Sequence, residues 1–90
     1  MSDEAVAVTL EEFVRKEGRV NADDPDFTRQ VNLFQSGYLD SLGTVHLIML
    51  IEDVFQVELS DDVLADPAFV SIDGISAIVA AGLLTRSPGR

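Results

Sequence analysis

The chain has 90 residues, 47% of them hydrophobic, and carries 16 acidic side chains against 6 basic ones. A chain of this length supports one hydrophobic core, so a single domain over residues 1–90 is predicted. Because it contains no cysteine, disulfides, sulfur-ligated metals and catalysis by a thiol of its own are excluded. The scarcity of basic residues argues against a nucleic-acid partner, since such surfaces need cations to neutralise phosphates.

The charges are unevenly distributed along the chain. Basic residues occur only between positions 15 and 29 and at positions 86 and 90. The interval from Gln30 to Thr85 contains acids alone, namely Asp40, Glu52, Asp53, Glu58, Asp61, Asp62, Asp66 and Asp73. The resulting negative electrostatic field either keeps the surface solvated or steers a basic partner onto it. Composition leaves both interpretations open.

Neither a membrane segment nor a secretion signal is predicted, so we expect a cytoplasmic protein. No apolar run approaches the roughly 18 residues that a membrane-spanning helix needs. The first residues, 1–4, lack the basic and apolar stretches of a signal peptide. The start at Met1 and the absence of flanking linkers favour a freestanding monomer, with residues 1–2 and 86–90 flexible.

The first predicted helix runs from about residue 3 to 17. Gly18 follows it as a helix stop, although Thr9 and Glu12 match a capping box and leave a start near residue 9 open. Its apolar stripe has helical spacing and consists of Val6, Leu10, Phe13 and Val14.

Residues 19–39 show no regular period and form a long predicted connection. Turns are expected at residues 21–25 and at Ser36-Gly37, with a short helical turn after Pro25. Four residues are too apolar for a disordered linker and should pack over the helices: Phe27, Val31, Leu33 and Phe34.

The second predicted helix begins at Ser41, taken as its N-cap, and ends near Phe55. Two apolar stripes run along it. The first, directed to the core, comprises Leu47, Ile51, Val54 and Phe55. The second, which we call the docking face, comprises Leu42, Val45 and Met49 with the acids Glu52 and Asp53 one turn further on. This face is predicted to meet a transient protein partner, the alternative being a central helix buried on most sides.

Three helix-start signals follow in the last third of the chain. Ser60-Asp61-Asp62 is one, and Asp66 with Pro67 predicts a short helix to about Phe69. Ser71 caps a last helix to about Leu84, whose apolar face consists of Ile72, Ile75, Ile78, Val79 and Leu83. The predicted fold is all-α: a compact four-helix bundle of three main helices and one short helix, with a long loop between the first and second.

The segment around Ser41 carries a recognisable motif, Leu33-Phe34-Gln35-Ser36-Gly37-Tyr38-Leu39-Asp40-Ser41-Leu42-Gly43-Thr44-Val45. It resembles the prosthetic-group site of the acyl carrier and peptidyl carrier protein family. The resemblance implies that a phosphopantetheinyl transferase attaches 4′-phosphopantetheine from coenzyme A to Ser41, and that Asp40 helps to position this enzyme or its metal. The alternative role for Asp40 is that of a capping acid. A helix N-terminus also favours phosphate, because its free N–H groups point outward.

Other chemistry is not expected. His46 lies five residues after Ser41, about 140 degrees around the helix, too far to act as its base, so no catalytic residue is predicted and His46 is assigned to partner contact. The acids Asp23, Asp24 and Asp26 match a turn better than a metal site, and no metal ligands are predicted.

The resemblance implies a non-catalytic carrier that holds an acyl or aminoacyl group as a thioester. Its partners would be adenylating or acyltransferase loading enzymes and downstream acyl-transferring or condensing enzymes. Residues 37–45 are closest to D-alanyl and discrete aminoacyl carriers, while the content of Arg, Ala and Val favours polyketide or nonribosomal peptide biosynthesis, including antibiotics. The alternatives are a D-alanyl carrier for cell-wall polymers, a fatty-acid carrier, and an unmodified helical adaptor.

Overall fold

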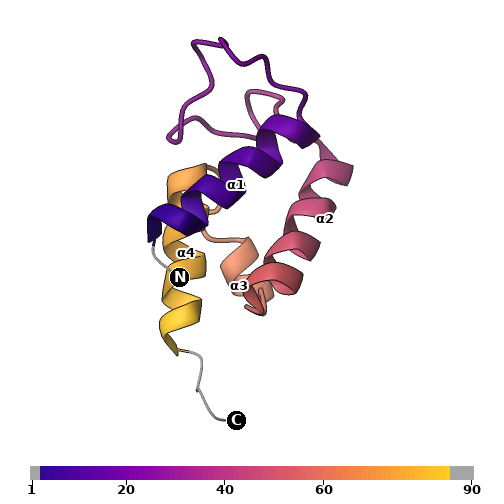
Figure 1. Cartoon of the computed structure of the whole chain (residues 1–90). Coiled ribbons are helices and arrows are strands. Elements are labelled where there is room, and N and C mark those ends of the chain that lie inside the picture. Colours follow the sequence, from indigo (N-terminus) through magenta and orange to yellow (C-terminus); the bar gives the residue numbers. More distant parts are fainter. Residues whose placement is uncertain (1–2, 86–90) are drawn as a thin grey trace.

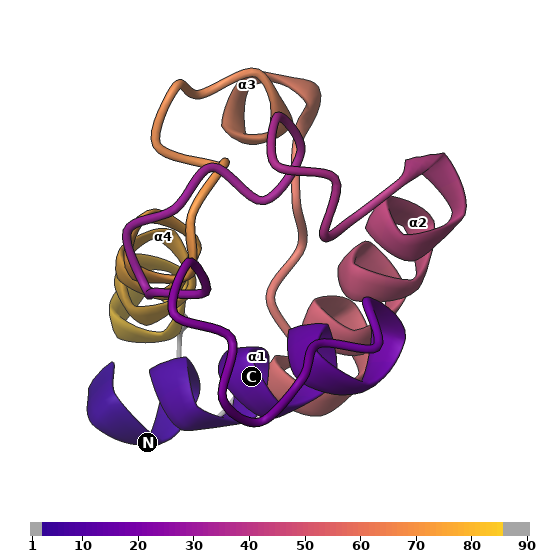
Figure 2. The same cartoon turned by 90° about the horizontal axis from the view of Figure 1, so that it is seen from above.

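The computed structural model describes residues 3–85, which form four α-helices and one π-helical turn (Figure 1). The elements are α1 (Asp3–Glu17), α2 (Ser41–Leu50), η1 (Ile51–Phe55), α3 (Asp61–Leu64) and α4 (Ile72–Thr85). Seen from above, the helices surround a common centre and the loop between α1 and α2 winds around it, past α4 and α3 (Figure 2). The predicted all-α bundle is confirmed. The termini expected to be flexible, 1–2 and 86–90, lie outside the described residues.

Helix α1 begins at Asp3, so the earlier of the two predicted starts is confirmed. At its other end, the Val20 N–H donates to the Arg15 carbonyl at 2.9 Å, and Arg19 has a φ of 51°. This is a Schellman-type end in which Arg19, and not Gly18, takes the left-handed conformation. Gly18 is needed for another reason, because a Cβ there would lie 2.5 Å from the Tyr38 carbonyl oxygen.

Helix α2 begins at Ser41, but Ser41 is not its N-cap. Asp40 takes that place, with an extended backbone and a carboxylate oxygen that accepts the Gly43 N–H at 2.7 Å. The prediction was wrong by one residue because Asp and Ser are both favoured caps. In the structure the side chain of Asp40, the earlier of the two, accepts an N–H of the first turn.

The end of this helical segment departs from α geometry. The π-helical turn η1 has hydrogen bonds from residue i to i+5, so each residue advances less around the axis. As a result Phe55 returns to the core, 2% exposed, while Val54 is 48% exposed. The assignment of Val54 to the buried stripe was therefore wrong, whereas Leu47, Ile51 and Phe55 are buried as predicted.

The short helix is α3, whose first turn is capped by the Ser60 hydroxyl accepting the Val63 N–H. No helix follows Asp66, in contrast to the prediction. There the Asp66 carboxylate accepts the Ala68 N–H at 2.8 Å and forms a turn. Pro67 thus lies in a turn between α3 and α4, a conformation that Asp followed by Pro supports as readily as a helix start.

The core lies between α1, α4 and the inner side of α2 and η1, with the loop closing its upper end (Figure 1). Phe27 and Leu33 of the loop are buried, and the Leu33 N–H donates to the Val70 carbonyl at 2.8 Å. The largest fully buried side chains are Phe55, Leu10, Leu33, Leu47, Ile51, Ile72, Ile75, Val6, Val14 and Val79. The expectation that the apolar loop residues pack over the helices is thereby confirmed.

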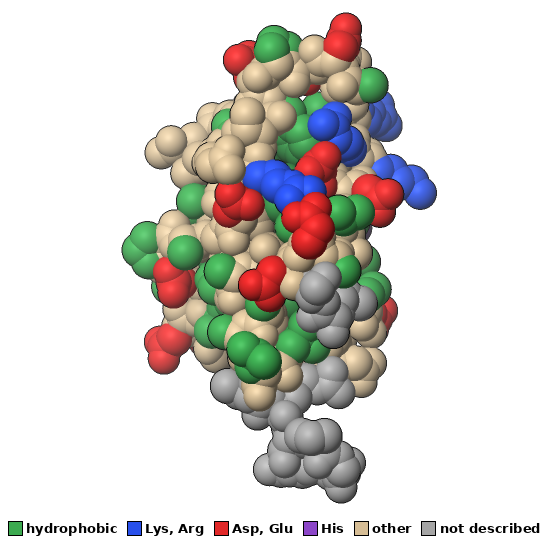
Figure 3. Space-filling view, turned by 60° about the vertical axis from the view of Figure 1, so that its left-hand side comes forward, with side chains coloured by type: hydrophobic (Ala, Val, Ile, Leu, Met, Phe, Trp, Pro, Cys, Tyr) green, Lys and Arg blue, Asp and Glu red, His purple; other side chains and the backbone are tan. Residues whose placement is uncertain are grey.

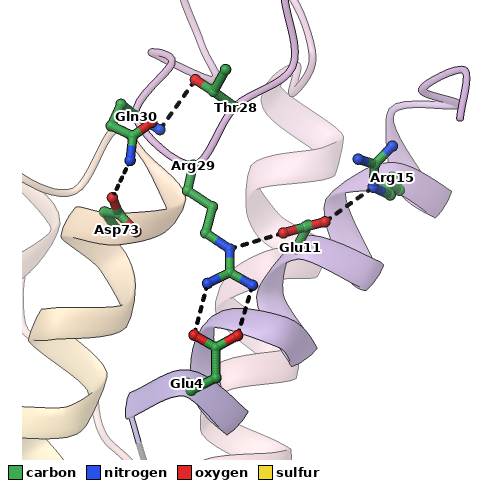
Figure 4. A network of polar contacts seen from close by, with 7 residues as sticks. All are labelled: Glu4, Glu11, Arg15, Thr28, Arg29, Gln30 and Asp73. Atoms are coloured by element: carbon green, nitrogen blue, oxygen red, sulfur yellow. Dashed lines mark hydrogen bonds and ion pairs between the residues drawn. The ribbon is translucent and has the colours of Figure 1, made fainter. Parts of the chain in front are cut away.

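The loop is also fixed by ion pairs through Arg29 (Figure 4). Its guanidinium donates to both carboxylate oxygens of Glu4, at 2.9 and 3.0 Å, and to Glu11 at 2.9 Å. The hydrogen bonds from Arg29 lower the pKa of both carboxyls, and those to Glu4 and then Glu11 raise the pKa of Arg29. The next residue, Gln30, donates to Asp73 of α4 at 2.7 Å. The loop therefore joins α1 to α4.

On the face shown in Figure 3, the visible Lys and Arg side chains gather in the upper half, among carboxylates, and hydrophobic side chains are scattered over the lower half. Within residues 3–85, no helix is both long and apolar enough to cross a membrane.

Candidate functional site

Ser41 is the first residue of α2 and is exposed to solvent. Its hydroxyl makes no hydrogen bond with any other described residue, 3–85. The turn beneath it is fixed by Asp40, whose carboxylate accepts the Gly43 N–H and whose carbonyl accepts the Thr44 N–H at 2.9 Å and the Thr44 hydroxyl at 2.7 Å. A free hydroxyl is thus held on an ordered helix start.

The other described serines differ from Ser41. The hydroxyls of Ser60 and Ser71 accept N–H groups at the starts of α3 and α4. Ser76 is buried, with 7% exposure. Ser36 is exposed but lies in the loop, before Gly37 with its φ of 85°. Among the serines of residues 3–85, only Ser41 is exposed, has a free hydroxyl and stands at the start of a helix.

The docking face lies open to solvent on the same helix. Leu42, Val45 and Met49 are 62%, 51% and 57% exposed, and Glu52 and Asp53 are exposed too. The alternative of a central helix buried on most sides is wrong, because only the stripe through Leu47 faces the core. Apolar side chains held in water beside acids form the kind of surface that a protein partner covers.

His46 follows Val45 of the docking face and contacts the end of α1. Its Nδ1 lies 2.8 Å from a carboxylate oxygen of Glu17, and its side chain is 43% exposed. Its assignment to partner contact stays a prediction.

A small pocket of about 200 Å³ adjoins Ser41. It is lined by residues 17–19, 37–38, 40 and 42–43, so it joins the end of α1 to the start of α2. For Tyr38, one of the lining residues, burial and then a hydrogen bond to Asp24 at 2.9 Å raise the pKa. Neither this pocket nor the presence of Arg19 in its lining was predicted from the sequence; the available signal was a basic residue directly after a helix stop.

The acidic side chains of the loop stabilise its turns. Asp24 accepts the Asp26 N–H at 2.9 Å as well as the Tyr38 hydroxyl. In the part of the chain that the structure describes, no group of three or more His, Cys, Asp or Glu side chains is arranged to hold a metal ion.

Comparison with known families gives one match. The family model described as "Phosphopantetheine attachment site" matches residues 8–79, most of the chain. No curated protein sequence matches closely enough to count as a relative. The exposed hydroxyl of Ser41 at a helix start fits what the group needs, a free oxygen able to form a phosphodiester. The chain belongs to the phosphopantetheine attachment family, the carrier proteins to which 4′-phosphopantetheine is covalently bound through a serine.

Proposed function

We propose that Ser41 is the serine that carries 4′-phosphopantetheine, and that the chain holds an acyl or aminoacyl group on this arm as a thioester. The observation that carries the proposal is the exposed, unbonded Ser41 hydroxyl at the start of α2, inside the matched region. The arm supplies a thiol to a chain that has no cysteine. The chain itself then needs no catalytic group and acts as the carrier between partner enzymes.

Attachment of the arm needs one atom from this chain. The Ser41 oxygen forms a bond to the pantetheine phosphorus of coenzyme A, the bond from that phosphorus to adenosine 3′,5′-bisphosphate breaks, and the hydroxyl proton passes to a base of the transferase. The base must come from the enzyme, because His46 is engaged with Glu17 at the end of α1. Asp40 holds the helix start in place and leaves the hydroxyl exposed.

The docking face supports recognition by several enzymes in turn. Glu52 and Asp53 attract basic surfaces over a distance, and Leu42, Val45 and Met49 provide apolar contact once the partner arrives. The face is short, so each complex should be weak and brief, as a shuttle requires. We assign the face to the phosphopantetheinyl transferase, to adenylating or acyltransferase loading enzymes and to downstream acyl-transferring or condensing enzymes, with His46 at its edge.

The pathway is proposed from the sequence motif and composition. Residues 37–45 favour an aminoacyl or D-alanyl type of carrier, and the richness in Arg, Ala and Val favours polyketide or nonribosomal peptide biosynthesis in the cytoplasm. A D-alanyl carrier for cell-wall polymers and a fatty-acid carrier remain the alternatives within the family.

The attachment site is tested by incubating the protein with coenzyme A and a phosphopantetheinyl transferase and measuring the intact mass. The wild type should gain one arm and Ser41→Ala none. Ser36→Ala is the matched control, since it removes the exposed serine of the loop and should still gain the arm. An arm on Ser41→Ala would refute the assignment, and an unmodified wild type would favour the helical adaptor.

The cargo is tested on the modified protein. Purified amino acid–adenylating enzymes, a D-alanine–activating ligase and a malonyl-loading acyltransferase are each offered the carrier, and thioester formation is followed by mass. Loading by an amino acid–adenylating enzyme other than the D-alanine ligase supports the peptide-type pathway. Loading by the malonyl enzyme alone would contradict an aminoacyl cargo.

A further inference from the structure

The pocket beside Ser41 offers a place for the phosphate of the arm, an inference that rests on the proposed function. Asp40 and Leu42, the two neighbours of Ser41 in sequence, line this pocket together with Arg19 at the end of α1. A group bonded to the Ser41 oxygen therefore begins between two residues that line a pocket of about 200 Å³, and the lining of this pocket also includes Arg19.

Arg19 has no ion-pair partner. Arg15 pairs with Glu11, and Arg29 pairs with Glu4 and Glu11. Arg19, in contrast, takes part in no ion pair or side-chain hydrogen bond with any residue in 3–85. A guanidinium that is left unpaired in so acidic a chain is available to an anion delivered beside it.

The two carboxylates of the pocket are already engaged. Glu17 contacts His46 Nδ1 at 2.8 Å, and Asp40 accepts the Gly43 N–H at 2.7 Å. Arg19 is the one Lys or Arg among the described residues that line the pocket.

The backbone of Arg19 gives a separate reason to assign it a role. Its φ of 51° lies in the left-handed region, which glycine adopts without steric cost and arginine does not. Arg19 thus carries a long side chain at a position where the backbone conformation favours glycine. Such conformations gather at binding and catalytic sites, where the side chain has a use that offsets the strain.

We propose that Arg19 pairs with the phosphodiester of the arm and directs its first segment across the pocket toward the end of α1. Because the phosphate is tethered at Ser41, its effective concentration near Arg19 is high and a weak ion pair suffices to hold it. The pair is exposed to solvent, so added salt weakens it and releases the arm.

The test uses the full-length protein carrying the arm, with attachment verified by intact mass, and nuclear magnetic resonance. In the wild type, the Nε–H signal of Arg19 should shift between the unmodified and modified forms, and the phosphorus signal should move as sodium chloride is raised. In Arg19→Gln the phosphorus signal should differ from that of the wild type and lose its salt response. Lys16→Gln is the matched control; it removes an equal charge from α1 outside the pocket and should retain the wild-type behaviour.

Arg19→Gly separates binding from folding. Glycine accepts the left-handed backbone, so the variant should melt no lower than the wild type while losing the phosphorus response. An unshifted Arg19 Nε–H signal, together with identical phosphorus signals and salt responses in the wild type and both Arg19 variants, overturns this inference alone. A wild type that gains no arm overturns the proposed function and this inference with it, and the intact mass distinguishes the two failures.

Discussion

Helices α1 and α4 differ from α2 in how much of their surface the fold uses. The first two pack against each other, and the loop joins them through Arg29 and Gln30. Helix α2 gives the core one stripe and leaves the docking face to solvent. The α1–α4 half therefore places more of its surface in the fold, while α2 keeps one face open for a partner. A fold divided in this way lets the recognition surface vary without loss of stability.

Two glycines, one in each half, should respond very differently to an added methyl group. A Cβ on Gly74 of α4 would collide with the Ala68 carbonyl oxygen, which belongs to the backbone. We expect Gly74→Ala to lower the free energy of unfolding by about 3 kcal/mol, the upper part of the range for overpacking. A Cβ on Gly43 of α2 would lie 3.1 to 3.3 Å from atoms of side chains, so Gly43→Ala should cost clearly less than Gly74→Ala, because side chains can yield where a backbone carbonyl cannot. Denaturant titration measures both.

Shortening an apolar side chain should also destabilise the α1–α4 half more than the docking face. Leu10 of α1 is 1% exposed and Met49 of the docking face is 57% exposed. Leu10→Ala should therefore cost about 2–5 kcal/mol through lost burial and the cavity left behind. Met49→Ala should change stability by less than about 0.5 kcal/mol. Equal losses in urea unfolding would contradict the division.

Acid should loosen the α1–α4 half through the Arg29 ion pairs. Because Arg29 lowers the pKa of Glu4 and Glu11 in the folded state, their contribution is present above the ordinary pKa of 4.5 and is lost as pH falls through the lower folded values. Arg29→Gln should lower Tm at pH 7 by less than Leu10→Ala does, since the pairs are partly exposed. It should also lessen the fall in Tm between pH 5 and pH 3 that calorimetry records.

The smallest effect on stability is expected from the acids of the docking face. Glu52→Lys with Asp53→Lys should leave the free energy of unfolding within about 0.5 kcal/mol. The same change should slow modification by the transferase about tenfold at low salt, because the field that attracts a basic partner is reversed. Asp61→Lys with Asp62→Lys on α3 changes the charge equally and serves as control. An equal loss of rate in both would show that net charge, and not the docking face, governs association.

Local signals predicted most of the fold. The stripe of α1, the start of α2 and the start of α4 follow from helical spacing and capping residues, which act within a few positions. The cap itself was placed one residue late, on Ser41 and not Asp40, since two adjacent residues both suit the role. The π-helical turn was missed because apolar residues at 47, 51 and 55 fit either geometry, and only the position of Val54 distinguishes them.

Contacts between distant residues could not be predicted. Local patterns sufficed to predict Ser41 as the attachment site and the residues of the docking face, because all of them lie within one helical segment. The Arg29 ion pairs and the pocket between residues 17–19 and 37–43 bring together side chains from separate segments. No local pattern specifies those distances. Arg19 in particular shows its position only once the end of α1 and the start of α2 are placed side by side.

The turn η1 also affects how this chain is compared with its family. A π-helical turn holds one residue more than an α-helical turn of the same span, so residues after Ile51 are displaced by one position relative to an uninterrupted α-helix. A relative without this turn would need a gap between positions 51 and 55 to align correctly. An alignment without this gap would match exposed Val54 to a core position of the relative and buried Phe55 to a solvent position.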